Sequence, residues 1–273
     1  MSTSLPTSSR SFDAARALQL AREALRDEAQ ALVAVSDRVG ESFADAIARI
    51  LATPGRVVVM GMGKSGHVGR KIAATLASTG TPAFFVHPAE ASHGDLGMVT
   101  QGDLVLGISN SGEANELTVL LPVLKRQGVP LIAMTGGLDS SLAKYADVVL
   151  DSGVEREACP LNLAPTTSTT AQMALGDALA VALLDARGFR AEDFARSHPG
   201  GALGRKLLTL VRDVMRKGDE LPRVPADASF SALMREMSAK SLGASTVVDA
   251  EGHLLGIFTD GDLRRLLGSG ADL

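Results

Sequence analysis

The residues with the clearest chemical potential lie in the stretch "VVVMGMGKSGHVGRK", from Val57 to Lys71. An apolar run there breaks at closely spaced glycines, and Lys64 and Ser65 follow before a run of helix-forming residues. At a strand-to-helix turn the first N–H groups of the helix are unpaired and attract an anion. The stretch therefore predicts a site for a phosphorylated molecule, with Lys64 as its positive charge.

The glycine spacing fits two phosphate-binding motifs only in part. Gly61, Gly63 and Gly66 match the dinucleotide pattern G-x-G-x-x-G, but the next strand-like run lacks the expected acidic residue at its end. The Gly-Lys-Ser order also matches the end of a P-loop, yet Val58 stands where the first glycine of that motif belongs. A tight packing turn with Lys64 in solvent is the alternative that this stretch leaves open.

Hydroxyl-bearing residues follow two other strand-like runs, each at the start of a helical run. They are Ser109, Asn110 and Ser111 in "ISNSGEANEL", and Thr166, Thr167, Ser168 and Thr169 in "APTTSTTAQ". Hydroxyls beside the unpaired N–H groups of a helix start form a cradle for an anion, although an ordinary serine N-cap is the alternative for the first group. Together with the glycine turn, these loops favour one phosphate on a small polar molecule over an adenine dinucleotide.

Alternating apolar and helical runs place these loops. Strands are expected at 56–61, 82–87, 103–109, 129–135 and 146–151, and helices at about 66–79, 113–127, 139–144 and 168–187. Continuous apolar strands separated by helices indicate an α/β fold with a parallel five-stranded sheet sandwiched by helices. Such sheets bind ligands at the carboxyl ends of their strands, which is where the polar loops lie.

Two helices are expected before the sheet, the first from Ser11 to about Val35 and the second at about 41–51. Ser11 and Asp13 are candidate caps of the first helix. Its leucines recur every seven residues, at Leu18, Leu25 and Leu32. This spacing favours packing in the protein's own core, with contact to another subunit as the alternative.

The sequence divides into three expected parts. Residues 1–10 are rich in serine and threonine and are expected to be disordered. Residues 11–208 form the sheet domain, and residues 209–273 form a small module that reads strand, helix, strand, turn, strand, helix. Only one copy of the module's motif is recognised, and a second is missing.

Composition excludes several classes of function. Of the 273 residues 45% are hydrophobic and 21% charged, as in soluble globular proteins. Aromatic residues make up 3%, tryptophan is absent and the formal net charge is −4, which argues against a nucleic-acid or membrane partner. A single cysteine, Cys159, allows no internal disulfide. The sequence, with no signal pattern or membrane-spanning run, predicts a cytoplasmic protein.

Several motifs together resemble a known family. The "GMGKSG", "SNSGE" and hydroxyl-loop pattern resembles the sugar isomerase (SIS) domain, which has a flavodoxin-like sheet. With "FFVHPAEASHGDLGM", "EREACPLNLAPTTSTT", "ARSHPGGALGR" and a CBS-type module, the chain resembles the arabinose 5-phosphate isomerases. The resemblance implies conversion of ribulose 5-phosphate to arabinose 5-phosphate for the sugar Kdo of lipopolysaccharide or capsule. A non-catalytic sugar-phosphate sensor is the alternative, since SIS domains also occur in regulators.

The resemblance also implies the catalytic residues. Aldose–ketose isomerisation through a cis-enediolate needs a base, stabilisation of the developing oxyanion and a group that moves hydroxyl protons. The family's catalytic positions fall on Lys64, Glu116, Glu157, His93 and His198. Glu157 is the favoured base, with Glu116 as the other candidate. A solvated helix-start glutamate is the alternative for each.

Further expectations concern substrate, metal and assembly. The substrate-binding positions are expected at Ser65, Gly80, Thr81, His93, Ser109, Asn110, Ser111, Thr166, Thr167, Ser168 and Thr169. No cofactor is required by the chemistry, while the resemblance places an inhibitory zinc at His87. It also implies a homotetramer with active sites near subunit interfaces, in which His198 reaches a neighbouring subunit.

The C-terminal stretch "GIFTDGDLRRLL" resembles the end of a CBS motif. In such a motif Thr259 and Asp262 contact a ribose or a related sugar. CBS motifs normally work as a pair around a nucleotide, so the single copy leaves open an appendage without a ligand.

Overall fold

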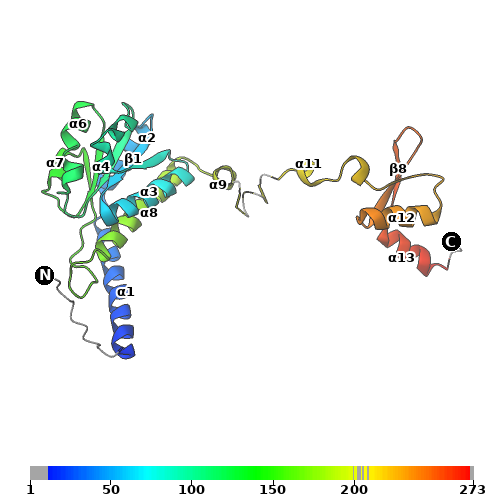
Figure 1. The fold of residues 1–273 in the computed structure, drawn as a ribbon, viewed down its shortest axis with the longest axis horizontal. Helices are drawn as coiled ribbons and strands as arrows, with labels where there is room; N and C mark the ends of the chain where they lie inside the picture. The colour runs from blue at the N-terminus through cyan, green and yellow to red at the C-terminus, as the bar shows by residue number, and fades with distance from the viewer. Residues whose placement is uncertain (1–11, 199, 202–203, 205, 208, 271–273) are drawn as a thin grey trace, which may run out of the picture. The chain divides into compact units, whose positions relative to one another are not determined.

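The computed structural model describes residues 12–198, 200–201, 204, 206–207 and 209–270 (Figure 1). The predicted tail at 1–10 and the predicted cap Ser11 lie outside the described residues. The chain forms two compact units, one up to Leu207 and one from Leu208 onward. No helix among the described residues is both long enough and apolar enough to cross a membrane.

The first unit is built on a five-stranded parallel sheet with the order β2-β1-β3-β4-β5. Its strands are β1 (Val57–Gly61), β2 (Ala83–Val86), β3 (Leu104–Ile108), β4 (Leu131–Thr135) and β5 (Val148–Asp151). Every residue of β1, β3 and β4 is buried, because helices cover both faces. The predicted α/β sheet is confirmed.

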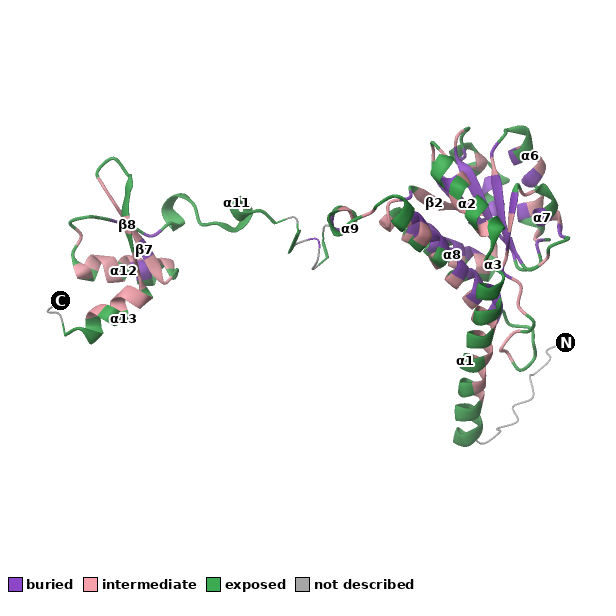
Figure 2. Cartoon of the chain, turned by 180° about the vertical axis from the view of Figure 1, so that it is seen from behind, coloured by how far each residue is buried: buried purple, intermediate pink, exposed green. Residues whose placement is uncertain are grey.

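Helices form one layer on each face of the sheet, and Figure 2 shows the buried strands between them. One apolar core joins the sheet to α1 (Ala14–Asp37), α2 (Glu41–Ala52), α3 (Gly63–Ser78) and α8 (Thr167–Ala186). The other joins it to α4 (Pro88–Ala91), α5 (Asn115–Thr118), α6 (Leu121–Arg126) and α7 (Ser141–Tyr145). The helix η1 (Asp95–Met98) follows α4. The helices thus cover both faces of the sheet, and loops lie at the ends of its strands.

The predicted helix at 113–127 is wrong as a single element. The structure divides it into α5 and α6, and Pro122 lies in the first turn of α6. Proline lacks the N–H that would continue the helix and its ring crowds the preceding turn, so the helix restarts there. By contrast, α3 begins at Gly63, earlier than predicted, so Lys64 and Ser65 belong to its first turn.

The first helix differs from its predicted packing. Asp13 caps α1 by accepting a hydrogen bond from the Arg16 backbone N–H at 3.0 Å. Leu18 and Leu25 are 57% and 69% exposed, so the favoured prediction that they pack in the core of this chain is wrong. Figure 1 shows the first turns of α1 projecting beyond the sheet, so the sheet does not cover them.

The second unit follows the predicted order of elements. After α11 (Val211–Val214) and η2 (Gly218–Glu220), its sheet has the order β6-β7-β8, with one parallel and one antiparallel pair. The strands are β6 (Arg223–Pro225), β7 (Ala244–Val248) and β8 (Leu254–Thr259), and the helices are α12 (Phe230–Lys240) and α13 (Asp260–Gly268). This is the small α+β module expected from the sequence.

Candidate active site

The parallel sheet brings several candidate residues to one edge. In the register of the sheet, Gly61 of β1 lies beside Ile108 of β3, and Met60 lies beside Val86 of β2. Lys64, His87 and Ser109 follow these three strands. Because parallel strands end on the same side, the three loops open on the carboxyl edge of the sheet, where α/β folds bind ligands.

The turn between β1 and α3 requires its glycines. A Cβ on Gly66 would lie 2.6 Å from the Gly61 carbonyl oxygen, and Gly63 has a φ of 53°. The turn is therefore a tight packing turn, but it also leaves the start of α3 without a side-chain cap. Lys64 in this first turn is exposed. Free N–H groups beside a lysine favour an anion, so the tight packing of this turn is compatible with the predicted anion site.

The loop after β3 is held rigidly with its hydroxyls oriented. The Oγ atoms of Ser109 and Ser111 accept hydrogen bonds from the N–H groups of Gly112 (3.1 Å) and Glu113 (3.2 Å). A Cβ on Gly112 would lie 1.9 Å from the Ser140 Oγ, so only glycine fits. Since each serine hydroxyl accepts in these bonds, its hydrogen is available to donate to an anion.

A neighbouring strand braces the same loop. The N–H of Gly136 and the hydroxyl of Thr135, both at the end of β4, donate to the Asn110 carbonyl at 3.0 and 3.3 Å. Glu113 accepts a bond of 2.7 Å from the Ser141 N–H, and hydrogen bonds from Ser141 hold the pKa of that carboxyl below its ordinary value. Glu116 lies exposed in the first turn of α5. The loop is therefore preorganised before any ligand binds.

Glu157 caps the start of α8 with its carboxylate. Its Oε2 accepts from the Thr166 N–H (2.7 Å), the Thr166 hydroxyl (3.2 Å) and the Ser168 N–H (3.2 Å), and its Oε1 accepts from the Ser168 hydroxyl. Burial by itself would raise the pKa of Glu157, but the hydrogen bonds from Ser168 and Thr166 outweigh it and lower that pKa. The carboxylate is consequently ionised at neutral pH.

The hydroxyl loop is thus organised around a residue of the chain itself. The Ala158 N–H donates to the hydroxyls of Thr166 (3.0 Å) and Thr167 (2.9 Å). Thr169 donates to the Thr166 carbonyl at 2.8 Å. The hydroxyls expected to hold a phosphate therefore have partners in this structure, and their role as phosphate ligands stays a prediction.

A polar bridge connects the glycine turn to α8. The Ser65 hydroxyl donates to the Gln172 Oε1 at 3.1 Å. Gln172 is fully buried, and its Nε2 has no hydrogen-bond partner among the described residues. Sequence reasoning missed this residue, although a glutamine among the apolar residues of α8 was the available signal. Through it, the loop with Lys64 and the loop with Glu157 are joined.

The two histidines after β2 differ in environment. His87 precedes α4, and its Nδ1 is buried without a partner in the described part of the chain, whereas His93 is exposed. An unpaired imidazole nitrogen suits one metal ligand. Yet the only group of three close potential ligands within the described ranges is Asp249, Glu251 and His253 in the second unit. His87 is not part of such a group, and the zinc expected there stays a prediction.

Three predicted site residues lie away from the carboxyl edge or are held elsewhere. Gly80 and Thr81 precede β2, at the opposite edge, and the Thr81 hydroxyl accepts from Arg187 Nε at 3.0 Å. His198 follows α9 (Ala191–Ser197), stacks on Phe194 with ring centroids 4.0 Å apart, and its Nδ1 lies 3.0 Å from the Phe194 carbonyl. Because a carbonyl only accepts, Nδ1 carries the hydrogen of this contact.

In the second unit, Thr259 and Asp262 cap α13. The Thr259 hydroxyl and N–H donate to the Asp262 carboxylate at 2.7 and 2.9 Å, and Asp262 also pairs with Arg265. Hydrogen bonds from Thr259 lower the pKa of Asp262. This capping box explains both residue types structurally, and their contact with a sugar stays a prediction.

Comparison with known proteins agrees with this architecture. Residues 50–182 match the SIS domain family and residues 211–269 match the CBS domain family. The chain is 61% identical over 248 residues to "Arabinose 5-phosphate isomerase KdsD" of Pseudomonas aeruginosa, covering 91% of this chain and 75% of the relative.

Two further relatives support the same family. The chain is 57% identical over 255 residues to the protein of the same name from Escherichia coli K12, covering 93% of this chain and 78% of the relative. A solved structure of a protein from E. coli CFT073 in complex with arabinose 5-phosphate is 44% identical, has a TM-score of 0.67, and covers 69% of this chain and 100% of its own. The chain therefore belongs to the arabinose 5-phosphate isomerase family.

Proposed function

We propose that this protein interconverts D-ribulose 5-phosphate and D-arabinose 5-phosphate, and that the product supplies Kdo synthesis. The observation that supports this most directly is the 61% and 57% identity to proteins named for that isomerisation, over more than nine tenths of the chain. A solved relative holds arabinose 5-phosphate. Lys64, Ser109 and Ser111 follow strands at the carboxyl edge of the sheet, where a small phosphorylated sugar would bind.

The phosphate binds to the loop after β3 in this proposal. The hydroxyls of Ser109 and Ser111 have hydrogens available to donate, and the uncapped start of α3 adds backbone N–H groups. Lys64 lies in that first turn of α3. Its positive charge is placed to stabilise the oxyanion that develops on the sugar.

Glu157 acts as the base. Its carboxylate removes a proton from C1 of the ketose, the electron pair of that C–H bond forms the C1–C2 double bond, and the C2 oxygen takes the negative charge. The carboxyl group then returns the proton to C2, while a hydroxyl proton moves from O1 to O2. The electrons stay within the sugar, so the reaction requires no redox cofactor.

In this proposal the oxygen of Glu157 with fewer hydrogen bonds accepts the proton. Oε2 accepts three hydrogen bonds, whereas Oε1 accepts only that of the Ser168 hydroxyl among the described residues. A carboxylate has about two acceptor positions on each oxygen. Oε1 therefore retains a lone pair for the proton, while Oε2 anchors the side chain to α8.

The remaining candidates assist in the transfer of hydroxyl protons. Glu116 and His93 are exposed on neighbouring loops and can contact sugar hydroxyls. His198, whose Nδ1 lies 3.0 Å from the Phe194 carbonyl, acts on a substrate in a neighbouring subunit of a homotetramer.

A non-catalytic sugar-phosphate sensor is the second function considered. The relatives with high identity are named as isomerases, which favours the enzyme. Solvent exchange separates the two functions, since a sensor binds the sugar without breaking a C–H bond.

The experiment incubates ribulose 5-phosphate with the protein in deuterated water and follows deuterium at C1 of the ketose and C2 of the aldose. We expect exchange with the wild type, loss of exchange with Glu157→Gln, and near-normal exchange with Glu155→Gln, an exposed neighbour. Binding of the sugar phosphate should persist in Glu157→Gln. Unchanged turnover in that variant would remove Glu157 as the base, and binding without exchange in the wild type would favour the sensor.

A further inference from the structure

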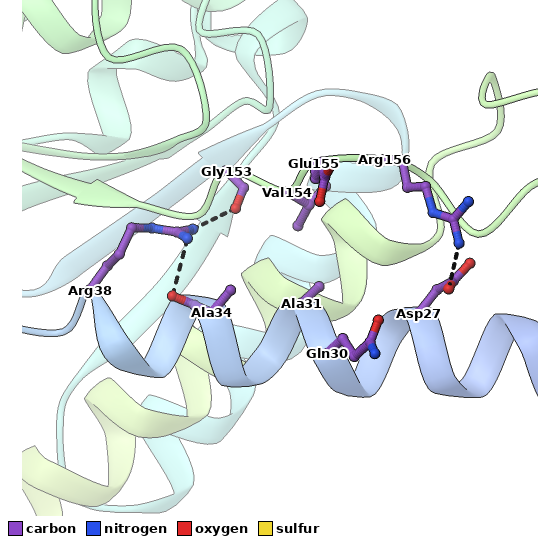
Figure 3. Close-up of a pocket in the computed structure, with 9 residues that line it drawn as sticks. All are labelled: Asp27, Gln30, Ala31, Ala34, Arg38, Gly153, Val154, Glu155 and Arg156. Carbon is purple, nitrogen blue, oxygen red and sulfur yellow. Dashed lines mark hydrogen bonds and ion pairs between the residues drawn. The ribbon is translucent and has the colours of Figure 1, made fainter.

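The segment that carries Glu157 is irregular chain between β5 and α8, and two polar contacts connect it to α1. The first contact is made by Arg38, the residue after α1. Its Nη2 donates to the Gly153 carbonyl at 2.5 Å and its Nε pairs with Asp151 at 2.8 Å. Its Nη1 also donates to the Ala34 carbonyl at 3.1 Å, which ties the guanidinium to α1 (Figure 3).

The second contact is an ion pair next to Glu157. Arg156 pairs with Asp27 of α1 at 2.7 Å, and Figure 3 shows the two side chains facing each other across the gap. The Asp27 side chain is 19% exposed and that of Arg156 is 66% exposed. Arg156 immediately precedes Glu157, so this pair acts on the backbone that carries the base.

Between these two contacts the segment is not packed on α1. A cavity of about 300 Å³ separates them, lined by Gln30 and Ala31 of α1 and by Val154 and Glu155 of the segment. Val154 packs against the apolar core of the first unit, whereas on the side of α1 the polar contacts at the two ends connect the segment to the helix.

We propose that Asp27 and Arg38 are positioning residues, which fix Glu157 against the start of α8 through Arg156 and Gly153. The inference rests on the proposed function, because it assigns the contacts to the base of that reaction. The proposal gives α1 a role in positioning the site, although no residue of α1 lies among the loops that follow the strands.

The proposal predicts a split between stability and activity. An ion pair with one largely exposed partner contributes little to folding, so its loss should leave the fold intact. A base displaced by ~1 Å, however, loses up to about a hundredfold in rate. A residue that merely stabilises the fold would change both quantities or neither.

The experiment compares Asp27→Asn and Arg156→Gln with Lys125→Gln. Lys125 forms a comparable exposed pair with Asp147, at 3.0 Å, before β5 and so at the opposite edge of the sheet. We expect kcat for the first two variants to fall about tenfold with little change in KM, since the reacting geometry rather than ground-state binding is altered. Lys125→Gln should keep the wild-type kcat. The charge-exchanged double variant Asp27→Arg/Arg156→Asp should recover most of the loss.

A second readout does not depend on activity. The N–H groups of Thr166 and Ser168 donate to Glu157, so their hydrogen exchange reports whether Glu157 remains seated. We expect faster exchange of both in Asp27→Asn and in Arg38→Gln than in Lys125→Gln. Wild-type kcat and wild-type exchange in Asp27→Asn would overturn the positioning role while the isomerase stands. A wild type that does not isomerise the sugar would overturn the proposed function, and amide exchange would still decide whether α1 positions Glu157.

Discussion

Replacing Ser168 by alanine removes one hydrogen bond from the Glu157 carboxylate and leaves its other donors in place. Burial raises the pKa of Glu157, and the Ser168 hydroxyl is the largest of the contributions that lower it. Its loss moves that pKa upward, so the carboxylate holds its proton to a higher pH. If Glu157 is the base, the acid limb of the kcat/KM profile moves to higher pH as well.

The size of the effect follows from the bond that is lost. A hydrogen bond to a charged group contributes about 1.5–3 kcal/mol, and partial exposure of Glu157 places this one at the low end. A free energy of ~1.4 kcal/mol corresponds to a factor of ten in an equilibrium. At a fixed pH on the acid limb, the fraction of its own plateau kcat/KM that the variant reaches should therefore be about tenfold smaller than the fraction that the wild type reaches. The plateau itself should not fall through loss of basicity, because the base becomes stronger.

The assay measures formation of arabinose 5-phosphate from ribulose 5-phosphate across the pH range for the wild type, Ser168→Ala and Thr169→Ala. Thr169 is the matched control, since its hydroxyl donates to the Thr166 carbonyl at 2.8 Å and not to Glu157. Its acid limb should coincide with that of the wild type. A folded Ser168→Ala enzyme with an unmoved acid limb would refute Glu157 as the titrating base.

The remaining predictions concern the fold and the phosphate. Asp103 is 1% exposed, and although burial raises its pKa, hydrogen bonds from Arg56 and Thr100 outweigh that effect and lower the pKa from 3.8 to about 2. This difference corresponds to ~2.5 kcal/mol of stability at pH 7, which is lost as the pH falls from about 4 to 2. Asp103→Asn should therefore unfold at lower urea at pH 7 but match the wild type near pH 2. Replacing Ser109 and Ser111 together by alanine should raise KM about thirtyfold with kcat nearly constant, at ~1 kcal/mol for each lost bond. Steady-state kinetics showing a lower kcat at constant KM would exclude them as ground-state phosphate ligands.

The sequence by itself determined the sheet and the edge at which its polar loops open. Apolar runs such as 56–61 and 103–109 could only be strands covered on both faces, and the structure has β1 and β3 there. Parallel strands end at one edge, so Lys64 and Ser109 follow neighbouring strands at the same edge of the sheet. These are local patterns, and local patterns are what a single sequence displays. The break between α5 and α6 at Pro122 was also locally encoded, although the prediction overlooked it.

Only the tertiary structure decided which side chains contact one another. The link between Ser65 and Gln172 joins residues that are far apart in the chain, as does the pair of Asp27 and Arg156. Neither leaves a periodic signal, because such partners depend on how two helices and a loop pack in space. The same holds for Glu157: its motif predicted a base but not the hydrogen bonds that its carboxylate accepts at the start of α8. The seven-residue spacing of the leucines in α1 likewise could not reveal that Leu18 and Leu25 are left exposed by the sheet of this chain.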